Sequence, residues 1–479
     1  MSQSKVVKNY IYNTAYQILV LIAPLVTTPY VSRVLGPEGV GIYSYGQSIA
    51  TYFVFIGIFG TTMYGQREIA YVHDDPVRRS QIFWEIVLIK SLAVALCTAV
   101  YIAVFAHGRQ YSAVFQVLIV EVAATAFDIT WFFMGLQNFK LTVIRNTIVK
   151  LIGIILVFVF VKKPEDVVIY TACMTLPTFI GNLSLWFSLP KYLVRVKLTK
   201  ERLLSHIRPT FALFVPQLAT EVYVLLDKTM LGALASNIDE VGFYSQASKI
   251  VKIVLLLVTS LGNVMMPAMA EAYAKGKEDV VVNSIRKAFR FVFMLGFALM
   301  FGLCGISKNF VPIFFGPGYD KVIILMIAIS PILILIAMSN VMGRQYLVPT
   351  RQEKGYSMSV ISGACVNFLL NLLLIRQFEA YGASIATVVA ELTVTLIQAY
   401  WVHKKINMFE CVGSGVRYLL IGLVMGVCVY LTGEALPGGI VTLCVQVLVG
   451  MAVYGGALLL LKDPLLMEGK QMLMNRKKR

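Results

Sequence analysis

Long apolar segments follow one another along almost the whole chain, and short polar stretches separate them. A helix of about 20 apolar residues is long enough to cross a bilayer. By this measure the pattern predicts fourteen transmembrane helices. They are expected at residues 9–35, 40–65, 81–106, 112–136, 141–161, 166–189, 209–235, 240–268, 288–308, 322–344, 355–376, 381–402, 416–434 and 439–461.

The composition also indicates an all-α integral membrane protein. Apolar residues make up 58% and charged residues 14% of the 479 positions, and the mean hydropathy is +0.76. Soluble domains contain about 45–50% apolar and about 25% charged residues. The net charge of +17 fits the Lys and Arg of cytoplasmic loops, so no nucleic-acid partner is expected.

The distribution of positive charge predicts the orientation. Thirty of the 42 Lys and Arg residues fall in the segments on one side of the predicted helices, and six fall on the other side. Because Lys and Arg accumulate in cytoplasmic loops, both termini are predicted to lie in the cytoplasm. The strongest anchors are expected at 191–208, 275–290 and the tail 475–479. The connections 189–209 and 269–288 are predicted to form short helices along the inner surface.

Other chemistry is excluded by missing motifs. The seven cysteines are scattered without CxxC or metal spacing, so they are interpreted as packing residues and no metal is expected. The first apolar segment is too long for a signal-peptide core and is expected to remain as the first helix. The chain contains no GxxxxGK[ST] motif, which excludes ATP hydrolysis by that route. No cofactor is expected.

Two short internal matches indicate a repeat. Val40–Ser44 (VGIYS) matches Val241–Ser245 (VGFYS) at an offset of 201 residues, and Gly135–Gln137 matches Gly343–Gln345 at an offset of 208. An offset of six helices preserves orientation, which is typical of parallel repeats in transporters. The expected regions are a six-helix lobe at 1–189, a basic cytoplasmic linker at 190–208, a second six-helix lobe at 209–402 and, at 403–479, two further helices with a basic cytoplasmic tail.

Several ionisable residues lie inside predicted spans, where each is a hypothesis for a functional site because its burial in a bilayer is costly. Glu221 and Lys228 are seven residues apart on one helix face, and Lys249 and Lys252 are neighbours on the next helix. Glu391 is near the middle of its span. For each residue, a structural ion pair or a side chain that snorkels to the interface is the alternative interpretation.

The charges favour an anionic substrate. Lysines around a midplane cavity would bind phosphate or pyrophosphate through charge-assisted hydrogen bonds, which strengthen where water is scarce. The aromatic content of 12%, rich in tyrosine, suits sugar stacking, although aromatic belts at the two interfaces explain most of it.

Two motifs resemble those of a known family. The run Thr27–Gly41 (TTPYVSRVLGPEGVG) is similar to the first hairpin of bacterial polysaccharide (Wzx-type) flippases, and Asp128–Gln137 (DITWFFMGLQ) is similar to their fourth-helix signature. These flippases belong to the multidrug/oligosaccharidyl-lipid/polysaccharide exporter superfamily. The resemblance covers nearly the whole chain and implies two six-helix lobes around a central cavity, followed by two C-terminal helices.

The resemblance also implies a function. A Wzx-type flippase moves oligosaccharide repeat units linked to undecaprenyl pyrophosphate from the inner to the outer leaflet of the bacterial cytoplasmic membrane. The implied mechanism is alternating access, and the product would serve capsule, O-antigen or exopolysaccharide synthesis. The implied partners are the lipid-linked oligosaccharide, membrane lipids, and the polysaccharide polymerase and glycosyltransferases of the same pathway. The protein would be a secondary-type transporter and not an enzyme.

The expected site follows from both arguments. Arg33 and Asp128 lie in the matched motifs and are expected to bind substrate. Lys228, Lys249 and Lys252 are expected to bind it because of their depth in the membrane, although for Arg33 and Lys228 a structural cap or anchor is an equal alternative. Ion coupling is expected at Glu221 and Glu391, which could instead be the partners of buried lysines. No catalytic or metal-binding residue is expected.

Three rival functions remain open. A drug or organic-cation antiporter of the same superfamily would usually have twelve spans and a cavity rich in carboxylates. A membrane polymerase or glycosyltransferase would usually have a sizeable outer loop, and every predicted outer loop here is short. A scaffold without transport activity would leave the charges within the membrane unexplained. The sugar composition, the polysaccharide pathway, the coupling ion and the oligomeric state are left open by the sequence.

Overall fold

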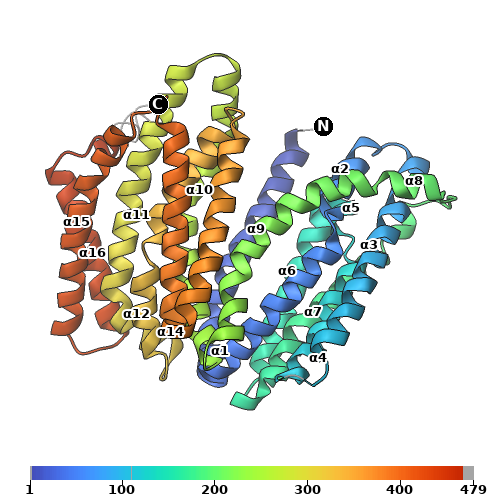
Figure 1. Cartoon of the computed structure of the whole chain (residues 1–479), viewed down its shortest axis with the longest axis horizontal. Coiled ribbons are helices and arrows are strands. Elements are labelled where there is room, and N and C mark those ends of the chain that lie inside the picture. Colours follow the sequence, from blue (N-terminus) through green and yellow to red (C-terminus); the bar gives the residue numbers. More distant parts are fainter. Residues whose placement is uncertain (1–2, 109, 468–479) are drawn as a thin grey trace. The chain divides into compact units, whose positions relative to one another are not determined.

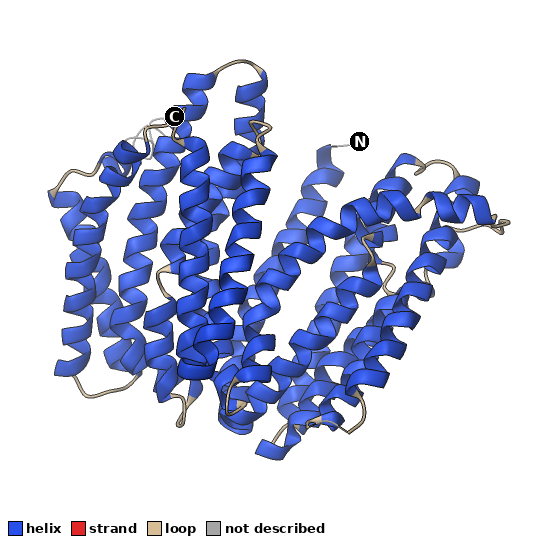
Figure 2. Cartoon of the chain, viewed as in Figure 1, coloured by secondary structure: helices blue, strands red, loops and turns tan. Residues whose placement is uncertain are grey.

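The computed structural model describes residues 3–108 and 110–467, and these residues form helices joined by short connections, without a strand among them (Figure 2). The prediction of an all-α membrane protein is confirmed. Eleven helices in the described part are long and apolar enough to cross a membrane. The tail 475–479, predicted to be an anchor, lies outside the described residues.

Two of the eleven candidates are much longer than a bilayer requires. Tyr16–Tyr71 has 56 residues and Glu353–Val402 has 50, whereas about 20 residues cross the hydrocarbon core. Each is interrupted by a residue outside the helical conformation, Gly36 (φ 66°, ψ −179°) in the first and Glu379 (φ 52°, ψ −127°) in the second. The interruptions coincide with the predicted connections 36–39 and 377–380. The exact number of fourteen crossings stays a prediction.

The chain divides into two compact units. Unit 1 contains Met1–Ala233 and Asn237–Gly242, and unit 2 contains Leu234–Ser236 and Phe243–Arg479. Residues 209–233, which the sequence pattern assigns to the second lobe, therefore belong to unit 1. The lobes predicted from the internal repeat stay a prediction.

Most helices of unit 1 are connected by short turns, and a longer segment, 192–199, precedes α8 (Figure 1). Asp75 shows how one of them begins, since its carboxylate accepts hydrogen bonds from the backbone N–H groups of Val77 and Arg78, and Pro76 occupies the first helical position. The elements are α1 (Gln3–Ile58), α2 (Thr61–Tyr71), α3 (Pro76–Phe105), α4 (Ser112–Ala124), η1 (Thr125–Phe127), α5 (Thr130–Gly135), α6 (Phe139–Phe160), η2 (Pro164–Asp166), α7 (Val167–Trp186), η3 (Leu189–Lys191), α8 (Lys200–Ser205) and α9 (Ile207–Leu234).

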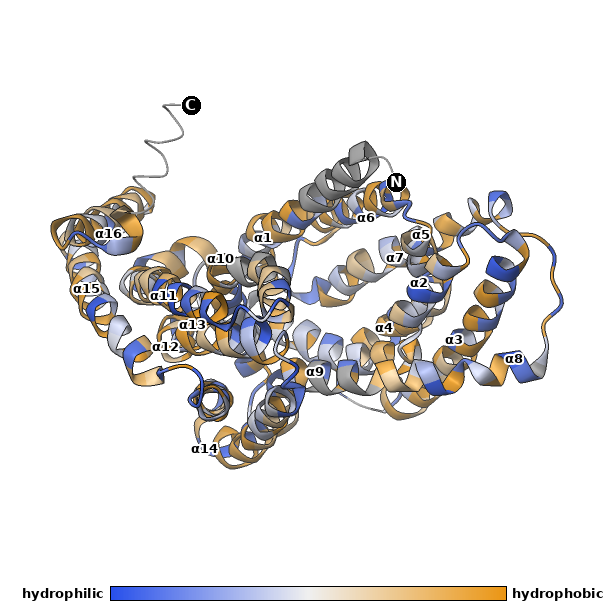
Figure 3. Ribbon diagram, turned by 90° about the horizontal axis from the view of Figure 1, so that it is seen from above, coloured by the Kyte–Doolittle hydropathy of each residue, from blue (hydrophilic) through white to orange (hydrophobic). Residues whose placement is uncertain are grey.

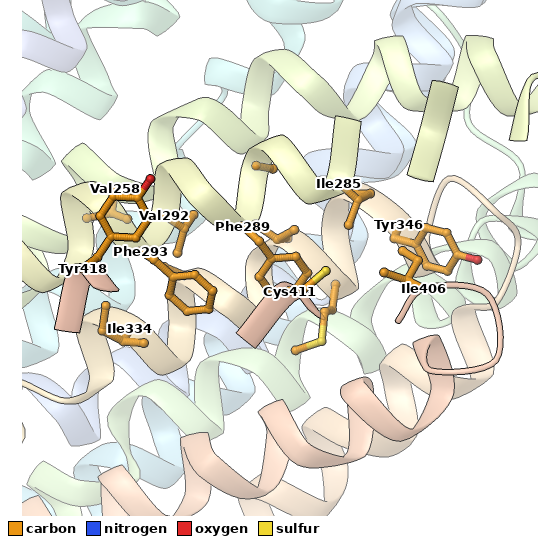
Figure 4. Close-up of a cluster of buried hydrophobic side chains, with 14 of the residues drawn as sticks. Val258, Ile285, Phe289, Val292, Phe293, Ile334, Tyr346, Ile406, Cys411 and Tyr418 are labelled. Atoms are coloured by element: carbon orange, nitrogen blue, oxygen red, sulfur yellow. The ribbon is translucent and has the colours of Figure 1, made fainter. Parts of the chain in front are cut away.

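The helices of unit 2 share a core of buried apolar side chains. Phe289 and Phe293 of its core cluster appear in Figure 4, and the stack continues along one helix through Phe297, with ring centroids 5.8–5.9 Å apart. The elements are α10 (Asp239–Ala274), α11 (Glu278–Phe315), α12 (Asp320–Ile329), α13 (Ile332–Ser339), the π-helix η4 (Asn340–Leu347), α14 (Glu353–Val402), α15 (Met408–Ala435) and α16 (Ile440–Leu460).

The apolar surface of the helices is consistent with a multi-pass membrane protein. Apolar residues predominate along the helices of both units, and polar residues are frequent in the connections (Figure 3). The first predicted surface helix corresponds to α8. The second does not exist as a separate element, because α10 and α11 extend into 269–288 and leave only a short turn between them.

Candidate functional site

The fourth predicted span is broken in the middle of unit 1. Helix α4 ends at Ala124, a short 3₁₀ turn follows, and α5 begins at Thr130. A broken helix within a membrane requires partners for the backbone carbonyl groups that it frees. Side chains of α3 and α7 supply them: Lys90 donates to the Asp128 carbonyl, Asn182 to the Ala124 carbonyl at 2.8 Å, and Trp186 to the Phe127 carbonyl at 2.8 Å.

Asp128 lies at this break and helps to shape it. Its carboxylate accepts hydrogen bonds from the backbone N–H and the hydroxyl of Thr130, at 2.9 and 2.7 Å, and so fixes the first turn of α5. The carboxylate also interacts electrostatically with Lys90 and Arg145. Asp128 is therefore engaged by the protein itself, and its predicted contact with a substrate stays a prediction.

Arg145 of α6 joins the same cluster and was not selected by the sequence analysis. Its guanidinium donates to the Gly181 carbonyl at 2.8 Å, to the Asn146 side chain at 2.5 Å and to the Asn182 side chain. Arg145 is close to the start of its predicted span, where a charge is expected to reach the cytoplasmic side. Its spacing of seventeen residues after Asp128 gives no sign that the two groups meet.

A second polar pair connects α1 with α4. The side-chain amide of Gln47 donates to the carboxylate of Glu121 at 2.6 Å. The phenol of Tyr101, which is fully buried, interacts electrostatically with this carboxylate. Glu121 thus has a partner on another helix within the candidate spans, although it was not among the residues expected to couple ions.

A third polar chain ties the basic linker to unit 1. The ring of His206, between α8 and α9, is within hydrogen-bonding distance of the Glu85 carboxylate on α3 (2.9 Å) and of the Tyr64 hydroxyl on α2 (2.6 Å). All three residues are buried. Sequence analysis did not select His206, since a lone histidine in a basic linker gives no signal of its partners.

Besides Asp128 at the break, the site residues predicted in unit 1 lie on two helices, α1 and α9. Arg33 lies on α1 three residues before the Gly36 corner and is exposed. Glu221 and Lys228 of α9 are both half-buried. The hydroxyl of Thr229, next to Lys228, donates to Ser48 at 3.0 Å and so holds α9 against the second half of α1.

The remaining predicted residues belong to unit 2. Lys249 of α10 is half-buried, Lys252 one turn later is exposed, and Glu391 of α14 is buried. The predicted cations are therefore divided between the units, two in each. Within the described residues, no cluster of three or more His, Cys, Asp or Glu side chains could hold a metal ion.

Comparison with known proteins places these features in a family context. Residues 6–273 match the family described as "Polysaccharide biosynthesis protein". A protein of Escherichia coli (strain K12) that is named as an O-antigen transporter is 24% identical over 404 residues, which cover 83% of this chain and 97% of the relative.

Solved structures show the same fold. The lipid II flippase MurJ, in an inward closed conformation, superposes with a TM-score of 0.74 at 15% identity and covers 95% of this chain and 99% of its own. A multidrug resistance MATE family transporter of the MOP superfamily, in an inward-facing conformation, gives a TM-score of 0.61 at 10% identity, covering 81% of this chain and 95% of its own.

Proposed function

Because the chain belongs to the polysaccharide biosynthesis protein family, we propose that it moves oligosaccharides linked to undecaprenyl pyrophosphate from the inner to the outer leaflet of the bacterial cytoplasmic membrane. The observation that carries the proposal is the similarity, over 83% of the chain, to a relative named as an O-antigen transporter. The relatives are transporters and flippases, so this protein is a transporter of the Wzx type and not an enzyme.

The proposed substrate explains why a protein is needed. Sugar hydroxyl groups that enter hydrocarbon without hydrogen-bond partners cost several kcal/mol each, and a bare pyrophosphate costs far more. The undecaprenyl tail can remain in the bilayer while the polar head passes through a shielded path. Arg33 and Lys228 of unit 1 and Lys249 and Lys252 of unit 2 would supply charge-assisted hydrogen bonds to the pyrophosphate.

The proposed mechanism is alternating access, which the resemblance to Wzx-type flippases implies. In this mechanism the cations of the site would be exposed to one leaflet at a time. Asp128 would act on the substrate through the broken helix of unit 1 that it shapes. Ion coupling is proposed for Glu221, which is half-buried, and for Glu391, which is buried, because a carboxylate in a span can exchange its proton or a bound cation as its access to water changes.

The proposed setting includes the rest of the pathway. Both termini would lie in the cytoplasm, as the positive charges predict. Glycosyltransferases would complete the lipid-linked oligosaccharide on the inner side, and a polymerase would use it on the outer side. The proposed lobes are 1–189 and 209–402, with the linker 190–208 between them and the region 403–479 after them.

The test combines genetics with lipid analysis. Deletion of the gene in its host should abolish surface polysaccharide and cause the complete lipid-linked oligosaccharide to accumulate in the inner leaflet. Wild-type protein should restore export, whereas the double variant Lys249→Ala, Lys252→Ala should restore less than a tenth of it at equal protein level. The matched control is Lys275→Ala, Lys277→Ala, which removes two exposed lysines from the turn between α10 and α11.

The same strains separate the rival functions. The similarity to a multidrug transporter makes a drug exporter the second candidate. Unchanged surface polysaccharide together with increased sensitivity to cationic dyes would favour that candidate. Loss of polymer without any accumulated lipid-linked oligosaccharide would indicate a step before translocation and would contradict the proposal.

A further inference from the structure

Three connections of unit 2 surround a pocket of about 510 Å³. Ser236 comes from the connection before α10 and Lys321 from the first turn of α12, while Arg376–Glu379 and Tyr381 come from the corner of α14. Figure 1 shows the start of α12 and this corner at the same end of unit 2. Small-molecule sites have volumes of about 300–1,000 Å³, so the pocket can hold a charged sugar or a diphosphate.

Side chains from all three connections build the wall of the pocket. Glu379 breaks α14 with a φ of 52° and a ψ of −127°. Its carboxylate accepts hydrogen bonds from the Ser236 hydroxyl and from the Lys321 ammonium group, the latter at 3.2 Å. Backbone strain at a residue other than glycine persists only where its surroundings hold it, and it is found most often at functional sites.

The charges of the pocket do not cancel. The Lys321 ammonium group is balanced by Glu379 and lies 5.1 Å from the centre of the Tyr381 ring. Arg376 is exposed, and no acceptor in the described part of the chain engages its guanidinium. One positive charge is therefore in excess, on the side chain best suited to bidentate binding of phosphate or carboxylate.

A purely structural role accounts for only part of this arrangement. The contacts of Glu379 with Lys321 and Ser236 connect the corner to its neighbours. They do not involve Arg376, nor the ring of Phe378, which also lines the pocket and is 51% exposed. An uncompensated guanidinium beside accessible aromatic rings suits an oxyanion carried on a sugar or a lipid-linked head group.

We propose that this pocket is a subsite that holds an oxyanion of the transported head group at the outer face before its release. This inference rests on the proposed function and on the predicted orientation, in which the connections after α9, α11 and the first half of α14 lie outside the cell. The oxyanion is either the pyrophosphate of the lipid or an acidic group of the glycan.

Cysteine protection in the full-length protein tests the subsite. Gln377, which lines the pocket and is exposed, is replaced by Cys, and its reaction with a membrane-impermeant maleimide is measured over the background of the seven native cysteines. In intact cells the position should react from outside. In nanodiscs, undecaprenyl pyrophosphate should slow the reaction at least fivefold if the lipid supplies the oxyanion. If only the released acidic oligosaccharide slowed the maleimide reaction, the oxyanion would belong to the glycan.

Matched variants make the result specific. Adding Arg376→Gln should reduce the protection to less than twofold. Adding Arg351→Gln, which changes an exposed arginine in the turn between η4 and α14, should leave it intact. Absence of protection by both probes, or reaction only from the cytoplasmic side, would overturn the subsite. If protection were absent while Gln377→Cys still restored surface polysaccharide in the deletion strain, the subsite would be ruled out and the proposed function would stand.

Discussion

Two corners of the molecule perform the same task with different residues. Gly36 interrupts α1 and Glu379 interrupts α14, each in the middle of a helix of at least 50 residues and each with a positive φ. At Gly36, nothing lies within 4 Å of the position that a Cβ would take, so glycine is required by its backbone conformation and not by crowding. At Glu379, a longer side chain reaches two other connections. The first corner thus depends on the conformational freedom of glycine, whereas side-chain contacts support the second.

The largest effect on stability is expected for a substitution at Gly36. Gly36→Ala should lower the free energy of unfolding by about 3 kcal/mol, because a φ of 66° with a ψ of −179° is accessible essentially only to glycine. Thermal unfolding in one detergent measures the change. Gly413→Ala is the control, since Gly413 has similar open space without a positive φ and lies in α15, where alanine is favoured. Equal effects of the two changes would contradict the strain argument.

A third interruption, at Thr125–Ile129, extends the comparison to a break that depends on hydrogen-bond donors. Asn182→Leu removes the donor to the Ala124 carbonyl and an acceptor for Arg145. The free energy of unfolding should fall by about 2 kcal/mol, because buried polar groups are left without partners. The double variant with Arg145→Met should lose less than the sum of the single changes, as groups in contact do. Additive losses would show that the two side chains act independently.

A smaller change in stability is expected for a substitution at Glu379. Glu379→Gly relieves the backbone strain but removes the ion pair with Lys321. In this pair the Lys321 side chain is 24% exposed and the Glu379 side chain 29% exposed. A partly exposed pair contributes about 0–1 kcal/mol, and a positive φ is readily adopted by glycine. The unfolding free energy should therefore change by less than about 1 kcal/mol, while the ligand protection of the Gln377→Cys variant in the subsite assay is lost. A large loss of stability would mean that Glu379 is mainly structural.

The smallest effect on stability is expected for an exposed ion pair that lies away from these interruptions. Lys405 and Glu278 are 2.9 Å apart and more than half exposed. The hydrogen bond with Glu278 raises the pKa of Lys405, so any stabilisation is present at neutral pH and is lost only as the pH rises above the ordinary lysine range of about 10.4. The unfolding temperature of Lys405→Gln should differ little from that of the wild type, and the difference should be the same at every pH between 6 and 9. A pH-dependent difference within that range would contradict this.

Sequence reasoning located both corners, because an apolar helix that far exceeds the bilayer thickness must turn at its polar gap. It did not locate the break at Thr125–Ile129, where the sequence contains neither proline nor glycine. That break is set by Lys90, Asn182 and Trp186, which are remote in sequence. The Arg145 cluster and the His206 contacts were missed for the same reason, since the partners become visible only when the helices are packed.

The attachment of α9 to unit 1 has a consequence for the order in which the protein is made. Ser48, Tyr64 and Glu85, which contact α9 or the residue before it, leave the ribosome well over a hundred residues before those partners do. When α9 emerges, it therefore meets a surface that has already entered the membrane. Domains generally fold as units from the N-terminus during synthesis. Unit 1 can thus complete its packing before most of unit 2 has been translated.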